Sequence, residues 1–162
     1  MSRFRPPVRA KGDGFLVALG HDESALIMRL IDELRSLLND PEPDERELGL
    51  LQRLFPVAHH DDAELEAEYQ RLMREELVQS KLSAFDIVDE TLSGDGSIDE
   101  GQLLAVMQSI NSIRLVLGTM LGVNDDPDAD EVISGLEDSA EYHLYSYLSW
   151  LLEHCVQALS GR

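Results

Sequence analysis

The chain of 162 residues contains a single cysteine and no long apolar run. One thiol excludes a framework of disulfide bonds and is typical of proteins of the reducing cytosol. Charged residues interrupt every apolar segment before about 18 residues, so the sequence predicts no membrane-spanning helix. The N-terminal stretch FLVALG is too short for a signal-peptide core, and no cleavage site follows it. We therefore expect a cytoplasmic protein that does not enter the membrane.

Positive charge is also scarce, because 13 lysines and arginines stand against 32 aspartates and glutamates. The net charge is −19, and the first 20 residues, with four cations and one acid, carry a local charge of +3. The remainder of the chain therefore carries −22. Since affinity for DNA comes largely from neutralising phosphates, direct DNA binding by the main body is not expected. The short basic arm offers only a minor route to a nucleic acid.

Motifs that carry enzyme chemistry are missing. The sequence has no glycine-rich phosphate loop and no Gly-x-Ser-x-Gly elbow. The stretch His59-His60-Asp61-Asp62 holds residue types that bind metals, but adjacent positions point in different directions and no second ligand pair follows at metal spacing. We expect a protein that is not an enzyme and has no cofactor or metal. A pocket of acids around Arg114, or a metal site at the histidine pair, is the alternative.

Helical periodicity is what the sequence has in abundance. Two short extended runs flank Lys11-Gly12-Asp13-Gly14, which predicts a β-hairpin arm within residues 1–20. Residues 21–160 have the periodicity of about five helices. These helices are expected from Asp22 to about Leu38, around Leu48–Leu54, from Asp61 to about Glu90, from about Ile98 to Leu121, and from about Leu136 to Leu159. The prediction is one mainly α domain over residues 1–162.

The predicted helices carry signals at their ends. Asp22 is expected to cap the first helix, and Asp61 with Glu64 has the spacing of a capping box for the third. About thirty residues is long for a globular helix, so we expect a break or a kink in the third helix near Gln79-Ser80. Gly122 stands where a left-handed C-terminal cap belongs.

The stretch TLSGDGSIDEGQ, residues 91–102, resembles an EF-hand loop in its centre. However, Thr91 and Gln102 occupy the first and last ligand positions, where calcium requires carboxylates. A turn followed by a capping box of Ser97 and Glu100 explains the same residues. We therefore do not expect a calcium site.

Cys155 lies on the apolar stripe of the last predicted helix, one turn from Leu151 and from Leu159. A buried thiol is largely protonated and behaves as a small apolar side chain. We therefore interpret Cys155 as a structural residue. A redox-active thiol is the alternative, which makes Cys155 the redox candidate of this chain.

Arg114 is the only lysine or arginine between Lys81 and Arg162, and it lies on an apolar stripe. A partly buried guanidinium needs carboxylate partners, and arginine suits bidentate pairing. We expect a structural ion pair that joins this helix to a neighbour, with a ligand-binding role for Arg114 as the alternative. The candidate partners are Glu137, Glu141, Asp86, Asp89 and Glu90.

Four stretches together resemble a known family. They are FRPPVRAKGDGFLVAL at 4–19, LLQRLFPVAHHDDAELEAEY at 50–69, INSIRLVLGTMLGV at 110–123 and YHLYSYLSWLLEHCVQAL at 142–159. In order and extent they are similar to the AosR-like family of actinobacterial oxidative-stress transcription regulators, formerly a domain of unknown function. No single motif among them is diagnostic of a chemical reaction.

The resemblance implies a cytosolic regulator that contacts an extracytoplasmic-function sigma factor in response to oxidation. The acidic charge favours the same route, since an acidic body suits the basic faces of transcription proteins. The resemblance also implies a gene neighbourhood shared with a Clp-protease adaptor, and that neighbourhood suggests the alternative, a non-enzymatic adaptor for proteolysis. An intramolecular disulfide requires two cysteines, and this chain has one. What remains is an intermolecular disulfide, if Cys155 is exposed and a homodimer supplies the second thiol, or a regulator with no redox switch.

Overall fold

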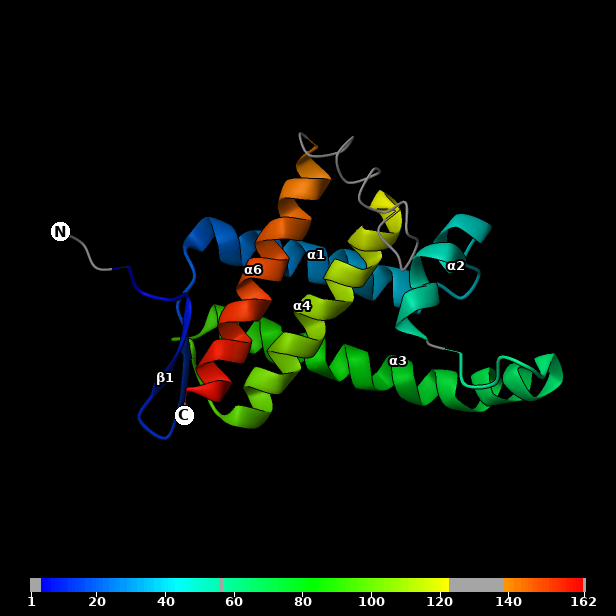
Figure 1. Cartoon of the computed structure of the whole chain (residues 1–162), viewed down its shortest axis with the longest axis horizontal. Helices are drawn as coiled ribbons and strands as arrows, with labels where there is room; N and C mark the ends of the chain where they lie inside the picture. The colour runs from blue at the N-terminus through cyan, green and yellow to red at the C-terminus, as the bar shows by residue number, and fades with distance from the viewer. Residues whose placement is uncertain (1–3, 56, 123–138, 162) are drawn as a thin grey trace.

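A computed structural model of the protein describes residues 4–55, 57–122 and 139–161. Figure 1 shows a helical body with a short hairpin near the N-terminus. In chain order the elements are β1 (Val8–Lys11), β2 (Gly14–Val17), α1 (His21–Asn39), α2 (Glu45–Leu51), the 3-10 turn η1 (Gln52–Leu54), α3 (Ala63–Ser93), β3 (Ser97–Ile98), α4 (Glu100–Leu121) and α6 (Ala140–Ser160). The predicted mainly α fold with an N-terminal hairpin is confirmed.

The hairpin has the predicted strands, and a third strand extends it. β1 and β2 pair antiparallel with Val8 opposite Val17, and Gly12 supplies a turn residue with a positive φ of 58°. β3 then pairs antiparallel with β2, with Phe15 opposite Ile98. The periodicity predicted that Ile98 begins a helix, but it is a buried strand residue instead. The small sheet is therefore fixed to the corner between α3 and α4.

Helix α4 lies at the centre of the helical body, where it contacts α1, α2, α3, α6 and β2 (Figure 1). Its buried apolar residues recur three or four positions apart and form one stripe, and the buried residues Ser109, Ser112 and Gly118 extend the buried surface beyond that stripe. The apolar residues are Leu103, Val106, Ile110, Ile113, Leu117 and Leu121. Because one neighbour covers only one side of a helix, the remaining elements are arranged around α4 to cover the others.

Among the described helices, α4 alone is long and apolar enough to span a membrane by length and composition. Half of its most apolar stretch is buried within the protein, however. The hydroxyls of Ser109 and Ser112 are buried too, and each donates to a carbonyl one turn earlier, at 2.9 and 3.0 Å. α4 thus has the character of the core helix of a soluble protein.

Helix α3 is continuous over 31 residues, so the break expected near Gln79-Ser80 is wrong. Its C-terminal part packs into the core through buried residues that include Phe85 and Val88. Its N-terminal part extends away from the rest of the helical body (Figure 1), and there Leu65 and Leu72 are 45% and 63% exposed. One helix therefore serves both as a core element and as a projecting arm.

Two of the expected N-terminal caps lie at other residues. α1 begins directly after Gly20 without a side-chain cap, so Asp22 is in its first turn. The cap of α3 is Asp62, one residue beyond Asp61, and its carboxylate accepts from the backbone N–H of Leu65 at 3.1 Å. Neighbouring aspartates satisfy the same spacing rule, and the backbone conformation decides between them.

Helix α4 begins with a capping box that the sequence pattern assigned to the wrong pair. Asp99 accepts from the backbone of Gln102 at 2.8 Å, and the Gln102 side chain accepts from the backbone of Asp99 at 2.9 Å. In the preceding turn, Asp95 accepts from the backbone of Ser97 at 2.8 Å. Both aspartates of the EF-hand-like stretch therefore bind backbone N–H groups. Gly122 is left-handed, with a φ of 76°, and the predicted C-terminal cap is confirmed.

We predict that Gly96→Ala destabilises the protein by about 2 kcal/mol or more. Gly96 has a φ of 83°, and an added Cβ would lie 2.2 Å from the carbonyl oxygen of Val17. The clash would separate the turn from β2. Urea unfolding measures the loss.

Gly49→Ala is the matched control, because an added Cβ at this position of α2 meets no atom within 4 Å. We expect it to stabilise the protein by roughly 0.5–1 kcal/mol, since alanine is the better helix former. Equal unfolding free energies for the two variants would contradict the described turn.

Candidate protein-binding groove

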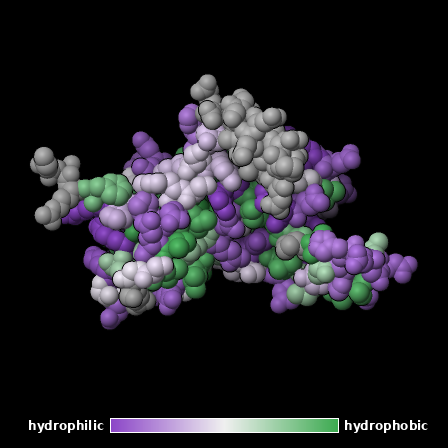
Figure 2. Space-filling model, in the orientation of Figure 1, coloured by the Kyte–Doolittle hydropathy of each residue, from purple (hydrophilic) through white to green (hydrophobic). Residues whose placement is uncertain are grey.

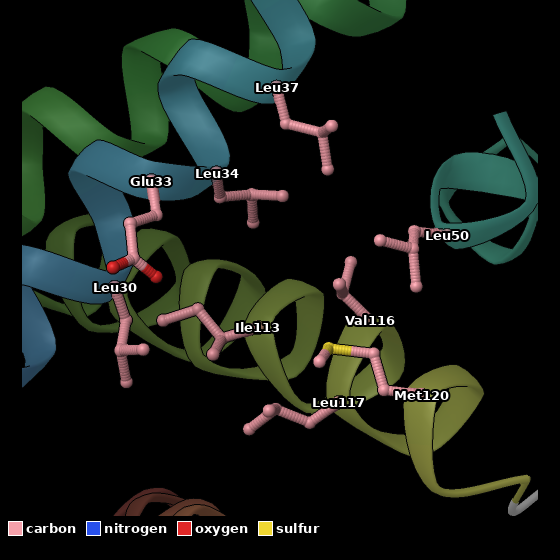
Figure 3. Close-up of a pocket in the computed structure, with 9 residues that line it drawn as sticks. All are labelled: Leu30, Glu33, Leu34, Leu37, Leu50, Ile113, Val116, Leu117 and Met120. Carbon is pink, nitrogen blue, oxygen red and sulfur yellow. The ribbon is translucent and has the colours of Figure 1, made fainter. Parts of the chain in front are cut away.

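An apolar groove with a volume of about 170 Å³ opens between α1, α2 and α4. Its lining consists of one acidic side chain, that of Glu33, and eight apolar side chains. The apolar residues are Leu30, Leu34, Leu37, Leu50, Ile113, Val116, Leu117 and Met120. Figure 3 shows the side chains of α1 and α4 on opposite sides of the groove, with Leu50 of α2 at one end.

The groove follows from apolar stripes that are wider than the contact between the helices. On α1, Leu30, Leu34 and Leu37 recur four and three residues apart and therefore share one face. Leu34 and Leu117 are buried, whereas Leu30 and Leu37 are half-buried and Met120 is 48% exposed. The outer part of each stripe therefore remains in contact with water, which is unfavourable unless another molecule covers it.

Among the described residues that line the groove, Glu33 is the only one with a charged side chain. It is exposed, and it makes no ion pair with any other residue that the structure describes. In Figure 3 its carboxylate lies beside Leu30, at the end of the view opposite Leu50 and Met120. The groove thus combines an apolar floor with a carboxylate that is available to a cation.

The chain that carries the groove is acidic as a whole, with a net charge of −19. Figure 2 shows a largely hydrophilic face on which hydrophobic side chains appear only in patches between the helices. A net charge of this sign favours the approach of cationic molecules over long range, while apolar contact is limited to small areas.

The ion pair predicted for Arg114 is not found among the described residues. Asp89 pairs instead with a cation of α1, so its assignment to Arg114 is wrong. Glu141 is exposed in the first turn of α6 and forms no described ion pair, and Glu137 lies outside the described residues. The guanidinium of Arg114 donates to the side-chain oxygen of Asn111 at 3.0 Å. Its described hydrogen-bond partner is therefore a neutral group of its own helix.

Arg35 of α1 makes the ion pairs that join two helices. Its guanidinium contacts Asp89 at 2.8 Å and Asp86 at 3.2 Å, both on α3, and it also contacts Asp32 on α1. Burial disfavours the charged guanidinium, but the hydrogen bond and the charge of Asp89 outweigh it, so the pKa of Arg35 is raised. Arg35 was not predicted to form these ion pairs, because cations are common on the exposed faces of amphipathic helices.

The histidine pair does not form part of a metal site among the described residues, which contain no group of three or more potential ligands. The ring of His59 packs edge-on against Tyr69, with centroids 5.7 Å apart. Its backbone N–H donates to Glu66 at 2.7 Å. These contacts hold the segment before α3 against that helix, which is a structural role.

Cys155 is fully buried on the inner side of α6, beside the buried residues Leu151 and Ala158. Burial raises the pKa of the Cys155 thiol to about 12. The adjacent His154 faces elsewhere, since its ring packs against Trp150 with centroids 4.6 Å apart. The interpretation of Cys155 as a structural residue fits this environment.

We predict that Cys155 of the folded protein reacts with a thiol reagent at pH 8 at least about 100-fold more slowly than in urea, because its thiolate is scarce and shielded. Mild peroxide should leave the protein at monomer size on a non-reducing gel. Rapid labelling of the native protein together with a peroxide-induced disulfide dimer would contradict this prediction.

We predict that Arg35→Gln destabilises the protein by about 1–2 kcal/mol, because it leaves the partly buried Asp89 without its cation. Arg114→Gln should cost less than about 1 kcal/mol, since its described partner is a neutral amide. Urea unfolding of both variants makes the comparison. A larger loss for Arg114→Gln would show that a carboxylate pairs with Arg114 after all.

Comparison with known proteins places nearly the whole chain in one family. A family model described as "Domain of unknown function (DUF2017)" matches residues 1–159. No curated protein and no solved structure matches the chain significantly. Since the match covers far more than half of the sequence, the protein belongs to the DUF2017 family.

Proposed function

We propose that the protein is a cytosolic transcription regulator that acts by contact with a sigma factor, as part of the response to oxidative stress. The observation that carries the proposal is the apolar groove between α1, α2 and α4, with its free carboxylate. A groove of this kind is suited to part of another protein.

The composition of the groove supports binding rather than catalysis. Apart from Glu33, the lining residues that the structure describes have no ionisable side chain and no hydroxyl or thiol group. A lone carboxylate lacks the second group that general acid–base or nucleophilic chemistry uses. Apolar side chains with one charged residue at the edge are instead typical of a protein contact.

The charge of the protein supports a partner from the transcription apparatus. Proteins that hold DNA carry lysines and arginines on the surface that faces the phosphates. A body with a net charge of −19 attracts such a surface and repels DNA itself. Contact with a sigma factor would thus be favourable without any reading of DNA sequence.

The burial of Cys155 bears on how oxidation enters this proposal. A thiol with no exposed surface and a raised pKa is a poor peroxide sensor. We therefore propose that oxidation acts on the partner, or on the amount of this protein in the cell, and not on the thiol of Cys155.

The test is affinity capture from the native cytosol, with and without peroxide, using the wild type and Met120→Gln as baits. We expect the wild type to recover a sigma factor, and Met120→Gln to recover about tenfold less, because loss of about 1.4 kcal/mol of apolar contact weakens binding by that factor. Leu72→Gln, on the projecting part of α3, is the matched control and should behave as the wild type.

Recovery of Clp components without any transcription protein would contradict the proposal and favour the adaptor alternative. A second measurement is transcription in vitro with purified polymerase and the captured sigma factor. The wild type should change the rate of initiation from the promoters of that factor, and Met120→Gln should change this rate by a smaller amount.

A further inference from the structure

We infer that the groove binds one face of a basic amphipathic helix, and that Glu33 pairs with a lysine or arginine of that helix. The inference deepens the proposed function. It rests on that function only for the identity of the protein that supplies the helix. Its basis is the shape of the groove, the position of Glu33 and the net charge of the chain.

The shape of the groove favours a helix over an extended segment. Its sides come from α1 and α4, and residues of each recur at the three- and four-residue spacing of a helical face. A third helix completes such a surface by placing its own apolar ridge between the two stripes. No described sheet edge borders the groove, so an added strand would find no backbone partners there.

The positions of the charged and apolar side chains give the occupant a direction. Glu33 and Leu30 lie at one end of Figure 3, and Leu50 and Met120 lie at the other. Leu30 and Leu37 are seven residues apart on α1, which corresponds to about 10 Å along the axis. The partner helix should therefore carry its cation toward the end with Leu30 and its apolar side chains toward the end with Leu50 and Met120.

Charge argues against a second copy of this chain as the occupant. Each copy has a net charge of −19, so two copies repel each other at short range. The described part of the groove lining offers no cation for the Glu33 of another copy. The negative charge of the protein attracts a basic helix, whereas it repels a second copy of the chain.

The test uses two designed peptides of 18 residues, built from leucine and lysine or from leucine and glutamate. In both peptides the leucines stand at i, i+3, i+4 and i+7 along one helical face. The protein is labelled with ¹³C at the methionine methyl groups, of which the chain has five. Met120 lines the groove, and Met73 on the projecting part of α3 is an internal control.

We expect the leucine–lysine peptide to shift the methyl signal of Met120 and to leave that of Met73 unchanged. The leucine–glutamate peptide should bind at least about tenfold more weakly, because its polar face meets an acidic surface. A shift of Met73 as large as that of Met120, or no shift of Met120, would overturn the inference.

Two pairs of variants separate groove binding from general attraction to an acidic protein. Glu33→Gln and Glu75→Gln each remove one exposed carboxylate, and only Glu33→Gln should weaken binding of the lysine peptide by about threefold or more. Met120→Gln should weaken it at least about fivefold, while Leu72→Gln should not. Equal losses within each pair would show general electrostatic attraction and overturn the inference.

The outcomes for the groove and for the regulator differ. Binding of the lysine peptide in the groove, without capture of a transcription protein, would contradict the proposed function and support the helix-binding site. If the wild type and Met120→Gln captured a sigma factor equally, and the peptide did not shift the Met120 methyl signal, the helix-binding site would be contradicted and the role as a regulator would be supported.

Discussion

The structure depends on the burial of α4 by the elements that surround it. Its buried residues lie around much of its circumference, so no single neighbour suffices, and α3, α6, α1, α2 and the small sheet each cover part of it. The groove is the place where this cover is incomplete. There α1 and α2 approach α4 closely enough to bury Leu34 and Leu117, but not closely enough to remove Met120 from water. The candidate site and the core are thus parts of one apolar surface.

The polar surface has two separate roles in this arrangement. The ion pairs of Arg35 with Asp86 and Asp89 join α1 to α3, so a few of the acids hold the body together. Most of the other charged groups face solvent, where they contribute little to stability but set the field that an approaching molecule meets. Glu33 belongs to the second kind and lies beside an apolar area, so it is the charged group of the candidate groove.

Periodicity was sufficient to predict most of the helices and the burial of Cys155, and turn and cap signals predicted the hairpin and the left-handed Gly122. Each of these depends on local backbone preference or on the apolar stripe of one helix. β3 was missed because a two-residue strand has no period and forms only when β2 lies beside it. The pairing of Asp89 with Arg35 was missed because it joins residues that are 54 positions apart.

The groove was predictable only in part, and for a related reason. The leucines of α1 were recognised as an apolar stripe, but a stripe does not show whether a neighbour covers its full width. That depends on the distance and angle between α1, α2 and α4, which no local pattern contains. The position of Glu33 at the edge of the groove follows from the same packing.

The pairing of β3 with β2 also has a consequence for synthesis of the protein. The hairpin leaves the ribosome early, but the strand that covers its open edge follows roughly 80 residues later, which takes about 4–16 seconds at typical bacterial and eukaryotic elongation rates. During that interval Phe15 and Val17, which are buried in the finished protein, have no partner on α3 or α4. The nascent chain therefore presents an unpaired strand edge with apolar side chains, which is the kind of segment that chaperones bind.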